Sequence, residues 1–235
     1  MKTTRLVDRR TFGANLLVLL ASGTLAGPAR AADEFAALPY RSLLDGITTF
    51  LNVPPEQRDR LALIQSLRPD SGNLVARPLT MTILAKAGPI DVAVGEDNSF
   101  SLPLSDQLKD ENPTVVTNQP KGSLSLQVGV RILLPQTTRY GYSEFALGIA
   151  QANAMTKRFA GVMWLFSKTA DSLILRFRRP ERQMLRIAAP DGALTLIADD
   201  SGTIFVRLDK KLAEENPVME LSEPAMDGLP ALSSR

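Results

Sequence analysis

The apolar residues of this chain change their spacing in the same order twice, from a helical period to strict alternation. Between residues 40 and 51 they recur three or four positions apart, which places them on one face of a helix. From about 79 to 104 they alternate with polar residues, as in strands with one buried face. The same two patterns return over 142–167 and 173–208. The predicted fold class is therefore α+β, with each half containing one or two helices followed by a small, mostly antiparallel β-sheet.

One segment of the first half fits both spacings. Pro55 stands where a helix could begin and continue to about Leu67. However, Leu61, Leu63 and Leu67 also alternate with polar positions, so the pattern leaves helix and strand open here.

The two halves of the chain also resemble each other residue by residue, which explains why the two spacing patterns occur twice in the same order. A Glu-Asn-Pro motif occurs twice, 104 residues apart, and that offset gives 9 identities in the 40 positions from 81 to 120. Upstream, residues 40–47 match 142–149 at an offset of 102. The motif residues are Glu111, Asn112, Pro113, Glu215, Asn216 and Pro217. These matches predict a tandem pseudo-twofold repeat, with unit 1 at 32–135 and unit 2 at 136–235.

The extent of the two predicted units follows from their flanks. No Gly/Ser-rich or Pro-rich linker separates them near 135–140, so we expect them to pack as one body. The second unit has little chain left after its motif, so its last strand is predicted to be short or missing. We expect the tail from about residue 225 to be poorly ordered.

The duplicated motif has a structural and a chemical interpretation. Ser105 and Asp209 are suitable N-caps for a short helix, and Asn-Pro ends that helix before a returning strand. Alternatively, Glu111 and Glu215 could form a carboxylate pair for acid-base chemistry. Duplication favours the structural interpretation, because a single active site rarely needs both copies.

The N-terminal segment has the composition of an export signal. A basic region is followed by an apolar stretch over about 14–26 and by a small-x-small site that ends at Ala31. This arrangement predicts a signal peptide over residues 1–31, cleaved between Ala31 and Ala32. The alternative is an uncleaved anchor, which the short apolar run disfavours.

The basic region itself resembles the twin-arginine class of bacterial signal. Arg9, Arg10 and Phe12 carry the resemblance, while Asp8 and Gly13 depart from the usual pattern. The resemblance implies export of an already folded protein to the periplasm or beyond. The general secretory route is the alternative.

Composition excludes several kinds of chemistry. The chain has no histidine and no cysteine, which rules out histidine-dependent nucleophiles, disulfides, and zinc sites built on these residues. Without residues 1–31 the chain has 22 basic and 24 acidic residues, so a basic surface for nucleic acid is not expected. No motif for a cofactor or metal and no transmembrane segment in the mature chain is predicted.

A few residues remain as weak candidates for binding. Arg176 and Arg178 share one face of a predicted strand, and they could contact an anionic glycan or lipid headgroup. Trp164, the only tryptophan, and Tyr142 could stack on a sugar or peptide. Solvated strand residues and core aromatics are the simpler interpretations. The acids of the predicted hairpin loops at 95–98 and 199–202 lack the spacing of a calcium site.

Three functional hypotheses fit these observations. The leading one is an exported periplasmic binding or accessory protein without catalytic activity, which acts on an envelope ligand or protein partner. The second is a carboxylate-based hydrolase of cell-wall or glycan substrate. The third is an envelope structural or assembly protein that uses a sheet edge to bind a partner strand.

Overall fold

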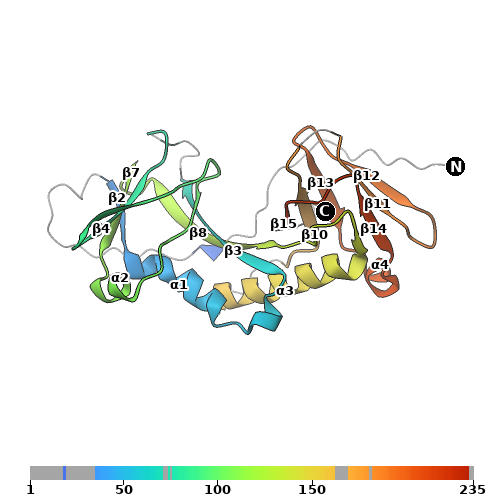
Figure 1. Cartoon of the computed structure of the whole chain (residues 1–235), viewed down its shortest axis with the longest axis horizontal. Coiled ribbons are helices and arrows are strands. Elements are labelled where there is room, and N and C mark those ends of the chain that lie inside the picture. The colour runs from blue at the N-terminus through green and yellow to red at the C-terminus, as the bar shows by residue number, and fades with distance from the viewer. Residues whose placement is uncertain are drawn as a thin grey trace. The chain divides into compact units, whose positions relative to one another are not determined.

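The computed structural model describes residues 18–19, 35–70, 74, 76–161, 169–179 and 182–232. This part of the chain is a mixed α/β structure with four α-helices and several antiparallel sheets (Figure 1). It divides into two compact units. The N-terminal unit comprises Leu17–Val53 and Leu63–Gly129, and the C-terminal unit comprises Pro54–Ala62 and Val130–Arg235.

The N-terminal unit consists of two short helices and two groups of strands. Its sheet has the order β2-β7-β4-β5, and β8, β3 and β6 are neighbours in a second sheet, where β1 also pairs with β8. The bounds are β1 Val18–Leu19, β2 Phe35–Pro39, α1 Tyr40–Leu51, β3 Leu61–Pro69, β4 Met81–Ala85, β5 Gly88–Val92, β6 Ser99–Phe100, α2 Asp106–Glu111, β7 Thr114–Pro120 and β8 Leu124–Ile132. The first two residues of β3 and the last three of β8 belong to the C-terminal unit.

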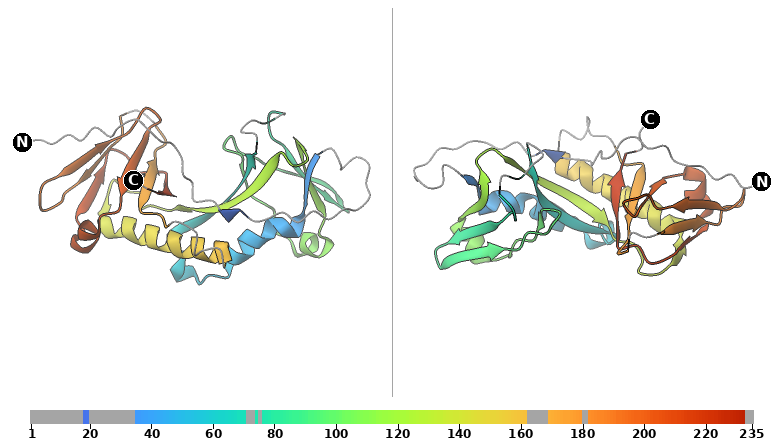
Figure 2. Two further views of the ribbon diagram at one scale, coloured as in Figure 1. Left: turned by 180° about the vertical axis from the view of Figure 1, so that it is seen from behind. Right: turned by 90° about the horizontal axis from the view of Figure 1, so that it is seen from above.

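The C-terminal unit places a longer helix along its strands (Figure 2). One sheet has the order β9-β14-β11-β12, and the other has the order β13-β10-β15-β8. The bounds are the 3₁₀ turn Pro55–Gln57, β9 Arg139–Gly141, α3 Tyr142–Ala160, β10 Ser172–Arg176, β11 Met184–Ile187, β12 Leu194–Ile197, β13 Thr203–Arg207, α4 Lys210–Glu215, β14 Val218–Leu221 and β15 Asp227–Ala231.

Each unit has its own apolar core. In the N-terminal unit, Tyr40 and Leu43 of α1 pack with Met81 and Ile83 of β4 in one buried cluster. Gly46 lets α1 approach β8 closely, because a Cβ at this position would lie 2.6 Å from a methyl group of Val128. In the C-terminal unit the fully buried side chains come from α3, β8 and both sheets, and include Tyr142, Phe145, Ile149, Ile132, Leu173, Leu175, Leu185 and Ile187.

Most predicted elements appear close to their expected positions, and the differences have local causes. The helix predicted over 142–167 ends at Ala160, where Gly161 adopts a φ of 52°. Residues 162–168 lie outside the described residues. The ambiguous segment after Pro55 becomes a 3₁₀ turn and then strand β3, in which alternate side chains pack inward.

The chain after residue 225 differs from the expectation of a poorly ordered tail. Residues 227–231 form β15, which pairs along its whole length with β10. Asp227, Gly228 and Ala231 are buried. The apolar pattern is weak here because the strand packs through small residues, and a methyl group at Gly228 would meet Leu173.

Candidate functional site

The duplicated Glu-Asn-Pro motif performs the same structural task in each unit. Asn112 and Asn216 both adopt a left-handed backbone with φ of 48° and end the short helices α2 and α4. Their side-chain oxygens accept hydrogen bonds from the first turns of α1 and α3, at Arg41 N (2.9 Å) and Ser143 N (2.8 Å). The carbonyls of the following prolines accept from Tyr40 N and Tyr142 N, both at 2.9 Å. The motif therefore caps the longer helix of its unit.

The two motif glutamates have different local partners. The Glu111 carboxylate accepts a hydrogen bond from Lys86 N–H, so it joins α2 to the β4–β5 turn. The position 104 residues after Lys86 is Pro190, which has no N–H to donate. Glu215 instead lies 3.8 Å from Lys211 within α4. Each carboxylate therefore has a local partner in its own unit.

Arg176 forms part of an ion cluster around the buried carboxylate of Asp227. Its Nε and Nη2 atoms donate to the two carboxylate oxygens of Asp227 at 2.7 and 2.6 Å, and Asp227 is 2% exposed. Arg131 approaches the same carboxylate at 3.6 Å. This bidentate pair joins β10 to β15. It gives Arg176 a structural partner and leaves Arg178, just after the strand, exposed to solvent.

The aromatic candidates do not form a surface in the described structure. Tyr142 is fully buried, donates to Arg207 O (3.2 Å) and accepts from Asp209 N (2.9 Å). It packs edge-to-face against Phe145. Trp164 lies outside the described residues, as do the signal residues Arg9, Arg10, Phe12, Ala31 and Ala32.

Two further observations on the described residues concern membrane-spanning helices and metal ligands. None of their helices is both long and apolar enough to span a bilayer. They also contain no group of three or more acidic side chains positioned to hold a metal ion. The carboxylate of Asp199 instead accepts hydrogen bonds within its own hairpin turn. Partial burial alone would raise the pKa of its carboxyl, but hydrogen bonds from Ser201 and Thr203 lower that pKa below its ordinary value.

Strand β12 lies at the edge of its sheet. Within the described residues β11 is its only paired neighbour in the sheet. Ala198 N–H donates to Gln183 O at 2.8 Å, which marks this pair as hydrogen-bonded. Bonded and non-bonded pairs alternate in an antiparallel ladder, so Leu196 and Leu194 also bond toward β11. The backbone groups of Thr195 and Ile197 therefore point toward the open edge.

The corresponding edge of the N-terminal unit is β5. Asn118 N–H donates to Thr80 O at 3.4 Å, so alternate residues of β4 bond toward β7 and the intervening ones toward β5. By the register of β4 and β5, Pro89 and Asp91 then present their backbones to the open edge. A proline without an N–H and a charged aspartate are both known devices that block strand addition.

The two edges therefore differ at the positions that decide pairing. At the offset of 104, Ala193 replaces Pro89, Thr195 replaces Asp91, and Ile197 replaces Ala93. The β12 edge has no proline and no charge, and two of its apolar side chains are exposed. Leu194 is 41% exposed and Ile197 is 66% exposed. Sequence reasoning did not identify these residues, although a position-by-position comparison of the two halves contains the signal.

Comparison with known proteins identifies a family for this chain. The described residues form a mixed α/β structure with four α-helices and several antiparallel sheets, one of which ends at β12. A family model described as "Protein of unknown function (DUF2987)" matches residues 36–177, and the chain belongs to that family. No curated protein and no solved structure matches the chain. The family match ends before β11 and β12, so it does not include the open edge.

Proposed function

We propose that this protein is an exported, non-catalytic accessory protein of the cell envelope that binds an extended segment of a partner at the edge of β12. The observation that carries the proposal is the contrast between the two edges. One presents Pro89 and Asp91 to solvent, and the other presents Thr195, with Ala193 directly before the strand. Open backbone donors and acceptors on an edge strand favour pairing with another strand.

The proposal includes the tandem pseudo-twofold repeat, because the edge comparison depends on it. The sheet orders β2-β7-β4-β5 and β9-β14-β11-β12 correspond element by element. The caps from Asn112 and Asn216, and the tyrosine hydroxyl bonds to Pro103 O and Arg207 O, recur at the repeat offset. Gly88 and Gly192, also 104 residues apart, have φ of 128° and 124°.

Export is the second component of the proposal, and the signal-like composition of residues 1–31 supports it. The test is the N-terminal mass of the protein recovered from the periplasmic fraction. We expect the recovered chain to begin at Ala32, and a twin-lysine variant at Arg9 and Arg10 to remain in the cytoplasm. Recovery of the full-length chain in the membrane fraction would contradict cleavage and favour an anchor.

Strand addition is tested by exchanging the edge residues of the two units. The variant Ala193→Pro with Thr195→Asp introduces the protected residues of β5 into β12. Because β5 holds both residues in an equivalent strand, the fold is expected to tolerate them. We expect a photo-crosslinker at position 197 to give a discrete adduct in cells, and the exchange variant to lose it.

The reciprocal variant provides the matched control. Pro89→Ala with Asp91→Thr opens the edge of β5, and we expect adducts to appear from a crosslinker at position 93. Without the reciprocal change, position 93 should give none. Equal adducts from positions 93 and 197 in the native chain, or none from either, would contradict the proposed function.

A further inference from the structure

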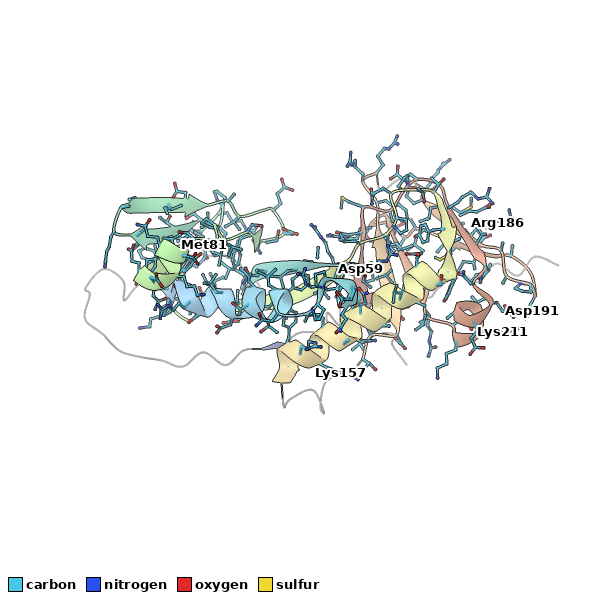
Figure 3. All side chains as sticks on the ribbon, turned by 60° about the horizontal axis from the view of Figure 1, so that its bottom comes forward. Asp59, Met81, Lys157, Arg186, Asp191 and Lys211 are labelled. Atoms are coloured by element: carbon cyan, nitrogen blue, oxygen red, sulfur yellow. The ribbon has the colours of Figure 1, made fainter. Side chains whose placement is uncertain are left out.

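The face of the β9-β14-β11-β12 sheet that carries Thr195 has an unbalanced row of charges. The strand register places Arg139, Glu220, Arg186 and Thr195 side by side, in that order, across the four strands. Glu220 lies 3.2 Å from Arg139 and 3.6 Å from Arg186, so one carboxylate serves two guanidinium groups. Figure 3 shows Arg186 on these strands, and its side chain is 55% exposed.

The next position in this row belongs to whatever pairs with β12. The four side chains of the row are positive, negative, positive and neutral. Their net charge is therefore +1. A residue opposite Thr195 would be two strand spacings, about 10 Å, from the Arg186 backbone. An acidic side chain there and the long Arg186 side chain can meet above the small Thr195. Cross-strand pairs of opposite charge favour pairing, and like charges disfavour it.

The other residues of β12 indicate which side chains the partner strand should carry opposite them. Ile197 lies on the same face as Thr195, beside Met184, and both are largely exposed. A residue opposite Ile197 is therefore best apolar. On the other face, Leu194 continues the buried row of Met219 and Ile187 but is 41% exposed. An apolar residue opposite Leu194 would cover it.

The other charges near β12 limit where the acid can lie. Asp191 at one end of the strand is paired with Lys211 (Figure 3). Asp199 at the other end accepts hydrogen bonds from Ser201 and Thr203. Partial burial would raise the pKa of its carboxyl, but these hydrogen bonds lower it. An acid placed toward Asp199 would meet a like charge, whereas one opposite Thr195 meets Arg186.

We infer that the partner at β12 is an extended antiparallel segment of another protein, with an acidic residue opposite Thr195 and apolar residues opposite Leu194, Leu196 and Ile197. This inference rests on the proposed function. A second copy of the chain is a poorer occupant. Its own β12 has no acid to offer, and it would bring a second face with an excess positive charge to the same edge.

The test uses synthetic peptides and the mature chain. Running antiparallel to β12, the peptide Thr-Val-Leu-Glu-Leu-Thr places Val opposite Ile197 and Glu opposite Thr195. Its control, Thr-Glu-Leu-Val-Leu-Thr, has the same composition and charge but exchanges those two positions. A second control replaces Glu by Lys. Binding is measured by calorimetry and by protection of the Thr195 and Ile197 amides from hydrogen exchange.

We expect the first peptide to bind about fivefold to tenfold more tightly than either control, equivalent to about 1 kcal/mol. The preference should disappear in 1 M salt, where the Debye length is about 3 Å. Arg186→Glu should reverse the preference and favour the Lys peptide. Arg186→Glu places a like charge directly opposite Glu220, so the melting temperature of this variant is expected to fall slightly, because both side chains are partly exposed.

The remaining outcomes separate the two proposals. Equal binding of all three peptides, abolished by Ala193→Pro with Thr195→Asp, would overturn the charge assignment and leave strand addition standing. A concentration-dependent dimer that this edge variant dissociates, with no peptide binding, would make a second copy the occupant and overturn the inference. No peptide binding, no dimer and no crosslink from position 197 would overturn both proposals.

Discussion

Three tyrosines show how the same side chain serves different purposes in this protein. Tyr40 and Tyr142 begin the longer helix of each unit, are fully buried, and donate their hydroxyl protons to Pro103 O and Arg207 O. Tyr140 is also buried, but among the described residues its hydroxyl has no hydrogen-bond partner. Burial raises its pKa well above the ordinary value. Leu38 occupies the equivalent place in the N-terminal unit.

This difference predicts opposite effects for the same substitution. Tyr140→Phe removes an unsatisfied buried hydroxyl, and we expect the free energy of unfolding to rise by up to about 1 kcal/mol. Tyr142→Phe removes two hydrogen bonds and should lower it by about 1–2 kcal/mol. Urea unfolding followed by circular dichroism measures both. A destabilised Tyr140→Phe variant would show that its hydroxyl has a partner.

At the scale of elements, the short helices α2 and α4 look alike but are tied into their units differently. Both end at an asparagine with a left-handed backbone that caps a long helix. Only α2 is also bonded, through Glu111, to the turn after β4, because Pro190 removes the corresponding donor in the other unit. Both copies of the motif therefore cap a long helix, but only the first also bonds to the neighbouring turn.

We predict an asymmetric response to the matched pair Glu111→Gln and Glu215→Gln. The first replaces a charge-assisted hydrogen bond with a neutral one and should cost about 0.5–1 kcal/mol of unfolding free energy. The second weakens only an exposed pair at 3.8 Å and should cost about 0–0.5 kcal/mol. Chemical denaturation provides the measurement. Neither change should affect peptide binding at β12, and lost binding with unchanged stability would assign these carboxylates a functional role.

On the scale of the whole molecule, the two compact units are not two consecutive halves of the chain. The C-terminal unit includes Pro54–Ala62 as well as Val130–Arg235. Arg60 explains the inclusion. Its side chain lies 2.8 Å from the Glu144 carboxylate of α3, and its backbone bonds with Leu133 N and the Gln151 side chain. The side chain of Ile132 on β8 is fully buried.

A chain cut at residue 136, the unit boundary predicted from the sequence, should therefore not fold properly. The fragment 136–235 lacks Arg60 and Ile132, so we expect it to show no cooperative thermal transition by circular dichroism. The control joins 54–62 through a Gly/Ser linker to 130–235, and this chain should unfold in a single transition. Equal melting temperatures for the two fragments would contradict the assignment of residues 54–62 to the C-terminal unit.

Sequence alone determined the local features of this protein. The spacing of apolar residues located α1 at 40–51, and the turn residues located both hairpin loops, because these depend on neighbours a few positions apart. The offset of 104 residues identified the duplicated motif as a helix end. It did not show that Asn112 caps α1, because that hydrogen bond joins residues 71 positions apart in the chain.

Only the tertiary structure decided which backbone groups remain open. The pairing of β11 with β12 determined that Thr195 and Ile197 face the open edge of one sheet. The pairing of β4 with β5 determined that Pro89 and Asp91 face the open edge of the other. The tertiary structure also placed Arg176 in a pair with the buried Asp227 and ordered the chain after residue 225 as β15. The open edges depend on the register of two hairpins, and the Arg176–Asp227 pair joins strands 51 positions apart. A shift of one residue in register would reverse every face.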